Sequence, residues 1–203
     1  MWATIQSRAH FTDKGRWELS FYHHLPKEQV CSKYIPFIKK TIADWSYTNP
    51  VDFNCLEKFF EIEPNLPGEL LRIIAARLDS GELVYINRHS FYNTFLKLLE
   101  TNVEVIKKLY IHQVLIQKYF DYNKAILLGL LTKEPQFLVE YIESVYINNT
   151  ERHRFYSDGL NVVWQIEDIE TVLKDVFDMM DREQPYHMNE HFCNAFFYTL
   201  ELN

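Results

Sequence analysis

The chain has 203 residues, of which 47% are hydrophobic, 24% charged and 16% aromatic, and this composition supplies enough apolar material for a single folded domain. Its 15 Phe and 13 Tyr against only 5 Gly argue against a disordered chain and against a turn-rich β-barrel. The formal net charge of −7 at pH 7 makes phosphate backbones and anionic lipid surfaces disfavoured partners.

Apolar residues recur at helical spacing from the first segment onward. In residues 2–22, Asp13-Lys14-Gly15 fits either a hairpin turn or the end of a loop before a helix, and we favour the helix. A second helix is expected over 27–45, restarted or kinked at Pro36, because proline has no amide proton to donate. Asp52 is the expected N-cap of the helix that follows.

The middle of the chain continues in the same way. A helix is predicted over 68–78, with Asp79-Ser80-Gly81 as its stop signal. Residues 83–86 form a β-like run that is too short and isolated to make a sheet. A helix is predicted over 91–99, and the next begins at a cap, Thr101 or Asn102, and reaches about 120. Further helices are predicted over 122–131, 137–146, 160–165 and 168–181, with a polar loop over 148–158. The last predicted helix contains Phe192, Phe196 and Leu200.

The clearest amphipathic stripe specifies architecture and not chemistry. It follows the i, i+3, i+4, i+7 rule at Ile169, Val172, Leu173, Val176, Phe177 and Met180. Nine to eleven short helices in hairpin succession must stack to bury such stripes, which predicts an all-α fold, an irregular α-solenoid or a helical bundle. We expect residues 1–203 to form one helical-repeat-like domain, with 1–24 as its least certain part.

Two stretches combine aromatic, acidic and proline residues in short phrases. The first reads Trp17-Glu18-Leu19-Ser20-Phe21-Tyr22 followed by Leu25-Pro26; the second reads Tyr119-Phe120-Asp121-Tyr122 followed by Leu127-Leu128 and Pro135-Gln136-Phe137-Leu138. These phrases resemble the C-terminal helical-repeat regions of large bacterial STAND-type NTPases and related defence proteins. The resemblance implies a segment that senses or binds a partner protein. The chain has no G-x-x-x-x-G-K-[ST] phosphate loop, so no ATPase activity is implied.

One motif suggests metal chemistry. His187-Met188-Asn189-Glu190-His191 fits the H-x-x-E-H string of inverted zinc metalloproteases, in which the two histidines share a metal and the glutamate activates water. The third ligand of that family lies far downstream, and here Glu201 is the sole candidate within the 12 residues that follow. We therefore expect a polar helix start and no metal or cofactor, with a small metal-dependent hydrolase as the alternative.

Candidate binding residues are aromatic or basic. Tyr119, Tyr122, Tyr141 and Tyr146 suit a protein interface, because tyrosine offers large contact area at low entropic cost, although the same rings also fit a core. Arg152 and Arg154, in a loop with Phe155 and Tyr156, could hold a phosphate or an acidic peptide, or lie in a solvated loop.

The predicted function is a non-catalytic helical module that binds a protein partner or the other domains of a larger chain. Cys31, Cys55 and Cys193 form neither a disulfide framework nor a zinc pattern, the longest apolar run is only 125–131, and the start of the chain is interrupted by charges. We therefore expect a soluble, cytoplasmic protein. The partner's identity and the oligomeric state are open.

Overall fold

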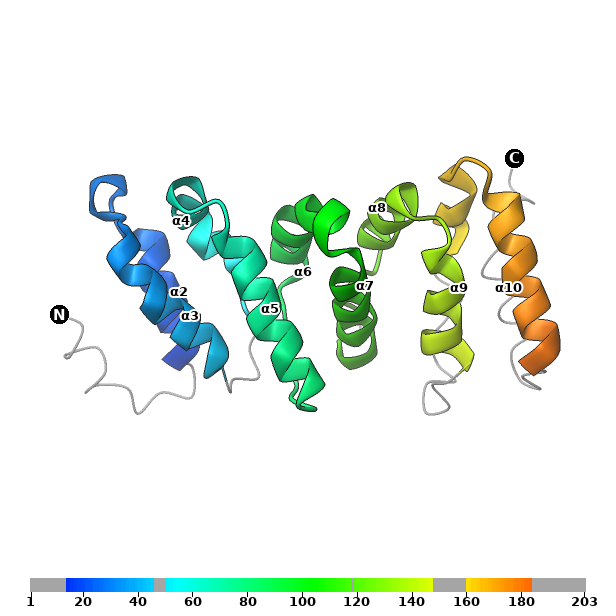
Figure 1. Ribbon diagram of the computed structural model, residues 1–203, viewed down its shortest axis with the longest axis horizontal. Helices are drawn as coiled ribbons and strands as arrows, with labels where there is room; N and C mark the ends of the chain where they lie inside the picture. Colours follow the sequence, from blue (N-terminus) through cyan, green and yellow to red (C-terminus); the bar gives the residue numbers. More distant parts are fainter. Residues whose placement is uncertain (1–13, 46–49, 118, 148–159, 184–203) are drawn as a thin grey trace. The chain divides into compact units, whose positions relative to one another are not determined.

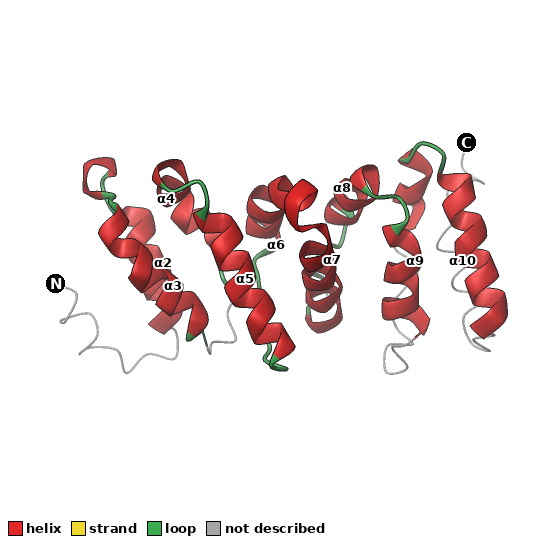
Figure 2. Cartoon of the chain, in the orientation of Figure 1, coloured by secondary structure: helices red, strands yellow, loops and turns green. Residues whose placement is uncertain are grey.

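The computed structural model describes residues 14–45, 50–117, 119–147 and 160–183. Every regular element in these ranges is helical, and the only strand-like contact is an isolated bridge, which confirms the all-α prediction (Figures 1 and 2). No helix in these ranges is at once long enough and apolar enough to cross a membrane. The chain divides into two compact units, residues 1–105 and 106–203, which we describe one at a time.

Unit 1 begins with α2 (Lys14–His24), which confirms the helix and not the hairpin for the described part of the first segment. The helix expected over 27–45 is divided into η1 (Lys27–Gln29), η2 (Ser32–Tyr34) and α3 (Ile35–Ala43). Pro36 lies in the first turn of α3, where a missing amide proton costs no hydrogen bond, so the proline restarts the helix and does not kink it.

Asp52 caps the next helical segment, as expected. Its Oδ1 accepts a hydrogen bond from the amide nitrogen of Asn54 at 3.0 Å, at the start of η3 (Phe53–Leu56), which leads into α4 (Glu57–Ile62). α5 (Leu66–Asp79) begins two residues earlier than predicted, because Pro67 is accommodated in its first turn. It ends at the predicted stop, where Gly81 adopts a left-handed φ of 79°.

The β-like run makes one parallel bridge between Val51 and Ile86, and no sheet. The amide of Val51 donates to the carbonyl of Tyr85 at 2.7 Å, and the amide of Asn87 donates to the carbonyl of Val51 at 2.8 Å. Asn87 then caps α6 (Arg88–Ser90) through its Oδ1. The helix predicted over 91–99 is irregular, with a wide turn, η4 (Phe91–Phe95), followed by a tight one, η5 (Leu96–Leu98).

A buried arginine joins α5 to the end of α3, the two helices that lie side by side in Figure 1. The guanidinium of Arg77, 8% exposed, donates to the carbonyl of Ile42 at 2.8 Å, to the carbonyl of Trp45, and to Glu82 at 2.7 Å. Carbonyls at the end of a helix lack partners within the helix. Arg77 therefore donates hydrogen bonds to two backbone carbonyls for which the sequence pattern does not indicate a donor.

α7 (Leu99–Ile116) contains a break at Asn102, whose φ of −142° is not helical, so the expected helix start at Thr101 or Asn102 is confirmed. The division between the two units falls within α7, after Val105. The helix ends at Ile116, and our prediction of an end near 120 was wrong. A turn closed by a hydrogen bond from the amide of Phe120 to the carbonyl of Gln117, at 3.1 Å, replaces its last part.

Unit 2 continues with α8 (Ala125–Lys133), which begins three residues later than predicted, after Lys124 in the left-handed conformation at φ 54°. α9 (Phe137–Ile142) runs on through a wide turn, η6 (Glu143–Ile147). After residues 148–159, which lie outside the described ranges, come η8 (Leu160–Gln165) and α10 (Ile169–Glu183), both expected. The predicted last helix, in 184–203, also lies outside these ranges.

The interior of unit 2 is aromatic. Tyr110 of α7 and Tyr141 of α9 have ring centroids 5.8 Å apart, and Phe137 packs edge-on against Tyr110 at 6.1 Å. All three rings are at most 1% exposed. Beside them, the buried ammonium of Lys107 contacts Glu134 at 2.8 Å, so this charge in the interior has a partner of opposite sign.

Candidate interaction surface

Two tyrosines protrude from the connection between α7 and α8. Tyr119 is 64% exposed and Tyr122 is 63% exposed. Their ring centroids lie 6.3 Å apart with an edge-to-face angle of 65°. We call residues 119–122 the tyrosine turn. It presents two large rings to solvent, close enough together to contact one partner side chain or backbone segment.

The two residues between these tyrosines point the other way. Phe120 is 4% exposed and Asp121 is 5% exposed. The Asp121 carboxylate accepts hydrogen bonds from the hydroxyl of Tyr110 at 2.7 Å and from the amides of Ile126 at 3.1 Å and Leu127 at 2.9 Å. Asp121 thus satisfies donors in the first turn of α8 and fixes the turn to the core of the unit.

Sequence reasoning did not find Asp121, and the reason is its position. It lies four residues before Ala125, outside the usual capping position, which Lys124 occupies. Lys124 occupies that position with φ at 54° and makes no side-chain cap; this left-handed conformation differs from the extended one usual for a capping residue and is uncommon for a non-glycine residue. No local pattern indicates this arrangement, since it depends on the contact with Tyr110, eleven residues away.

Of the other two tyrosines in the predicted set, Tyr141 belongs to the interior and Tyr146 lies at its edge. Tyr141 is fully buried, and Tyr146 is half-buried with its ring 6.1 Å from that of Tyr141. Burial, reinforced by the neighbouring Tyr146 and Asp121, raises the pKa of Tyr141 well above its usual value, so its hydroxyl stays neutral. We therefore leave Tyr141 out of the candidate surface, because its ring fills the space between helices.

Several predicted candidates lie outside the described residues. They are Arg152 and Arg154 of the basic loop, and His187, Glu190 and His191 of the metal motif. Among the residues that the structure does describe, no group of three or more His, Cys, Asp or Glu side chains is placed to hold a metal ion.

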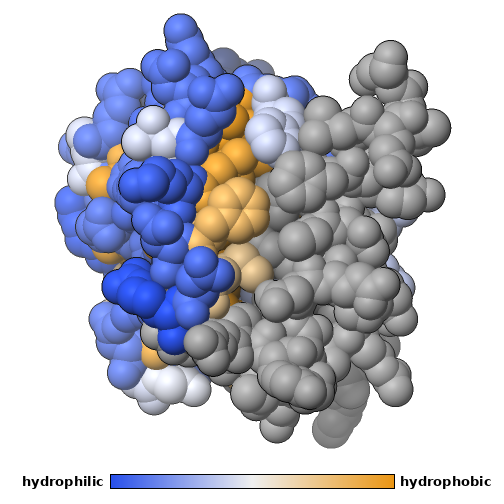
Figure 3. Space-filling view, turned by 90° about the vertical axis from the view of Figure 1, so that its right-hand side faces the viewer, coloured by the Kyte–Doolittle hydropathy of each residue, from blue (hydrophilic) through white to orange (hydrophobic). Residues whose placement is uncertain are grey.

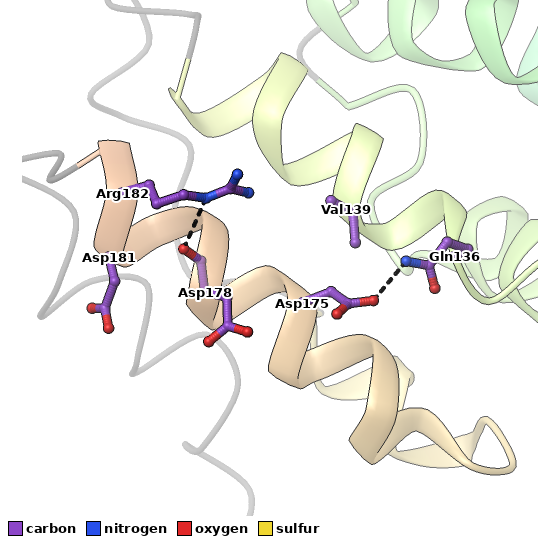
Figure 4. Close-up of a pocket in the computed structure, with 6 residues that line it drawn as sticks. All are labelled: Gln136, Val139, Asp175, Asp178, Asp181 and Arg182. Atoms are coloured by element: carbon purple, nitrogen blue, oxygen red, sulfur yellow. Dashed lines mark hydrogen bonds between the residues drawn. The ribbon is translucent and has the colours of Figure 1, made fainter.

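A shallow groove of about 570 Å³ separates α9 from α10. Gln136 donates to a carboxylate oxygen of Asp175 at 2.8 Å across it, and Arg182 Nε donates to the backbone carbonyl of Asp178 at 3.3 Å (Figure 4). The carboxylates of Asp178 and Asp181 point away from α9 in this view. The acidic side chains of α10 therefore diverge, as expected for a solvated helix face, and do not form a paired-carboxylate site.

The same side of the molecule carries an apolar strip next to a hydrophilic surface (Figure 3). On α10 the exposed large apolar side chain is Phe177, which is 37% exposed. A single ring at this level of exposure is common on protein surfaces. The tyrosine turn, with two rings that are each more than 60% exposed, is the stronger candidate for an interface.

The described residues offer contact area at the tyrosine turn. The tyrosine turn supplies two rings and two hydroxyl groups on a rigid support, a combination that is frequent at the centres of protein interfaces. Comparison of the chain with models of protein families, with curated proteins and with solved structures finds no match.

Proposed function

We propose that the chain is a non-catalytic helical module that binds a protein partner, with the tyrosine turn as an anchor. The observation that carries this proposal is the pair of rings exposed at 64% and 63% on a turn whose other two residues are buried. Leaving large apolar surface in water is unfavourable, by about 25 cal/mol for each Å² that a partner could cover. Covering both rings therefore supplies binding free energy.

The support beneath the turn matters for affinity as well. Three hydrogen bonds to Asp121 and the buried ring of Phe120 hold the turn in one conformation before any partner arrives. An interface that is ordered in advance loses little conformational entropy on binding. Tyrosine adds hydroxyl groups that can bond to a partner's backbone at the edge of the contact.

A site-specific crosslinking experiment tests this function. A photoreactive phenylalanine analogue replaces Tyr122 in the full chain, and a second variant carries it at Tyr92, which is 49% exposed in unit 1. We expect a discrete protein adduct from position 122 that is absent from position 92 and is reduced by Tyr119→Ala. Identical adducts from both positions, or an adduct that Tyr119→Ala leaves unchanged, would contradict the proposal.

A second proposal, on the biological form of the module, rests on the sequence resemblance alone. We propose a sensor segment of a larger bacterial defence-type protein, in which other domains carry the hydrolytic or effector chemistry. An NTPase or effector domain encoded in the same reading frame would support this assignment. A reading frame that encodes only this chain would instead favour a stand-alone adaptor.

A further inference from the structure

Unit 1 contains a half-enclosed pocket of about 470 Å³, within the size range of small-molecule sites. Side chains of α2, η3 and the segments that follow α3 and precede α6 line it. We propose that this pocket is a binding site for a small organic cation, an ammonium group on a short apolar body. The pocket lies in unit 1, so this inference is independent of the tyrosine turn in unit 2.

The charge of the residues that line the pocket favours a cationic ligand. Asp52 is the sole carboxylate among the described lining residues, and none of those residues is a lysine or an arginine. One of its oxygens, Oδ1, is used by the amide of Asn54. In the described part of the chain, no protein donor occupies its second oxygen. The carboxylate is therefore held in place by its capping role and still has acceptor capacity for a ligand.

The negative charge of Asp52 also acts on a second lining residue, Cys55. Cys55, three residues after Asp52, is half-buried and lines the pocket. Burial, and after it the negative charge of Asp52, raises the pKa of the Cys55 thiol to about 11. Burial opposes a charge of either sign, and only the smaller contribution, the negative charge of Asp52, favours a positive charge in the pocket. The thiol itself stays protonated at neutral pH and is a poor nucleophile there.

The remaining lining sets the shape of the ligand. Leu19, Trp45 and Pro50 are the apolar residues of the lining, and Ser20 and His23 are among its polar ones. An ammonium group at Asp52 with three or four carbons against the apolar residues matches both parts of the lining. A free alkylamine and the side chain of a lysine in a partner protein share this chemistry.

Alkylation of Cys55 provides the test, with Cys31 as an internal reference because it is half-buried and does not line the pocket. The full chain is treated with N-ethylmaleimide at about pH 8.5, because the thiolate is the form that reacts. The rate at each cysteine is read by mass spectrometry with n-butylammonium, n-butanol or butyrate present. At a concentration about nine times its dissociation constant, the ligand slows alkylation of Cys55 about tenfold by mass action.

We expect butylammonium to protect Cys55 and leave Cys31 unchanged, while butanol and butyrate protect neither. Asp52→Asn removes the charge and keeps the capping oxygen, so it should abolish the protection without unfolding unit 1. Asp44→Asn, at an exposed position outside the pocket, is the matched control and should retain it. Because Asp52→Asn also lowers the pKa of Cys55, the ratio of rates with and without ligand is compared within each variant.

Three results would overturn the proposal: no protection up to about 50 mM amine, well above a millimolar dissociation constant; equal protection by butanol; or full protection retained in Asp52→Asn.

The peptide acetyl-Gly-Lys-Gly-amide separates the two sources of the cation. Protection by the peptide and the amine identifies a lysine side chain, and protection by the amine alone identifies a free small molecule. Both outcomes support the site.

Discussion

Replacing Asp121 with alanine should destabilise unit 2 strongly. The substitution removes the acceptor for two amides at the start of α8 and for the buried hydroxyl of Tyr110. Loss of a helix-capping acceptor costs about 1 kcal/mol. Loss of a buried hydrogen bond to a charged acceptor, here that of the Tyr110 hydroxyl, costs about 1.5–3 kcal/mol. The two effects together lower the free energy of unfolding by about 3 kcal/mol.

Urea unfolding followed by circular dichroism measures this change, and hydrogen exchange of the amides of Ile126 and Leu127 locates it. A loss of about 3 kcal/mol in a unit of about 100 residues corresponds to a melting temperature lower by more than about 10 °C. The matched control is Asp175→Ala, which removes an exposed carboxylate with one hydrogen bond, to Gln136. It should cost less than about 0.5 kcal/mol.

The reasoning would be refuted if Asp121→Ala cost no more than Asp175→Ala. It would also fail if faster exchange appeared throughout the unit without enhancement at the start of α8. Tyr110→Phe gives an independent check. It removes one donor and leaves the carboxylate with two, so it should cost about 1.5 kcal/mol, less than the loss of the carboxylate.

Two further predictions concern other buried polar groups. Arg77→Ala should lower the free energy of unfolding of unit 1 by about 3 kcal/mol, because it removes the buried, charged donor to the carbonyls of Ile42 and Trp45. Urea unfolding measures this loss, and Arg77→Lys should recover only part of it. Burial lowers the pKa of His112, whose Nε2 has no hydrogen-bond partner in the described part of the chain. The folded state therefore binds a proton less readily than the unfolded state, so stability should fall as the pH drops below about 6.5. Unfolding at pH 5 and pH 8 should show a smaller pH dependence in His112→Gln, and an unchanged one would contradict this assignment.

Periodicity in the sequence was sufficient to predict which segments are helical. The apolar spacing of residues 168–181 predicted α10 (Ile169–Glu183) to within two residues at either end. Residues with a local role, such as Asp52 as a cap and Gly81 at a left-handed turn, were also identified in advance. These features depend on neighbours within a few positions, and a single sequence contains that information directly.

Two features that the sequence pattern did not indicate involve contacts between residues eleven or more positions apart. Between the end of α7 at Ile116 and the start of α8 at Ala125, the carboxylate of Asp121 accepts a hydrogen bond from the hydroxyl of Tyr110. Arg77 looked like an ordinary helical residue, although its acceptors lie 35 and 32 positions earlier in the chain. Helix propensity near these residues is weaker than the cost of leaving a buried polar group unpaired.

In the tyrosine turn, the contact between Asp121 and Tyr110 bears on which aromatic rings face solvent. Tyr119-Phe120-Asp121-Tyr122 contains three aromatic residues, and composition alone does not say which face solvent. Hydrogen bonding of Asp121 draws the middle of the turn inward, so the two outer rings are left at the surface. Asp121→Ala should therefore reduce both stability and partner binding, whereas Tyr122→Ala should reduce binding alone. If Tyr122→Ala destabilised unit 2 by as much as Asp121→Ala, its ring would be part of the core and the proposed anchor would be lost.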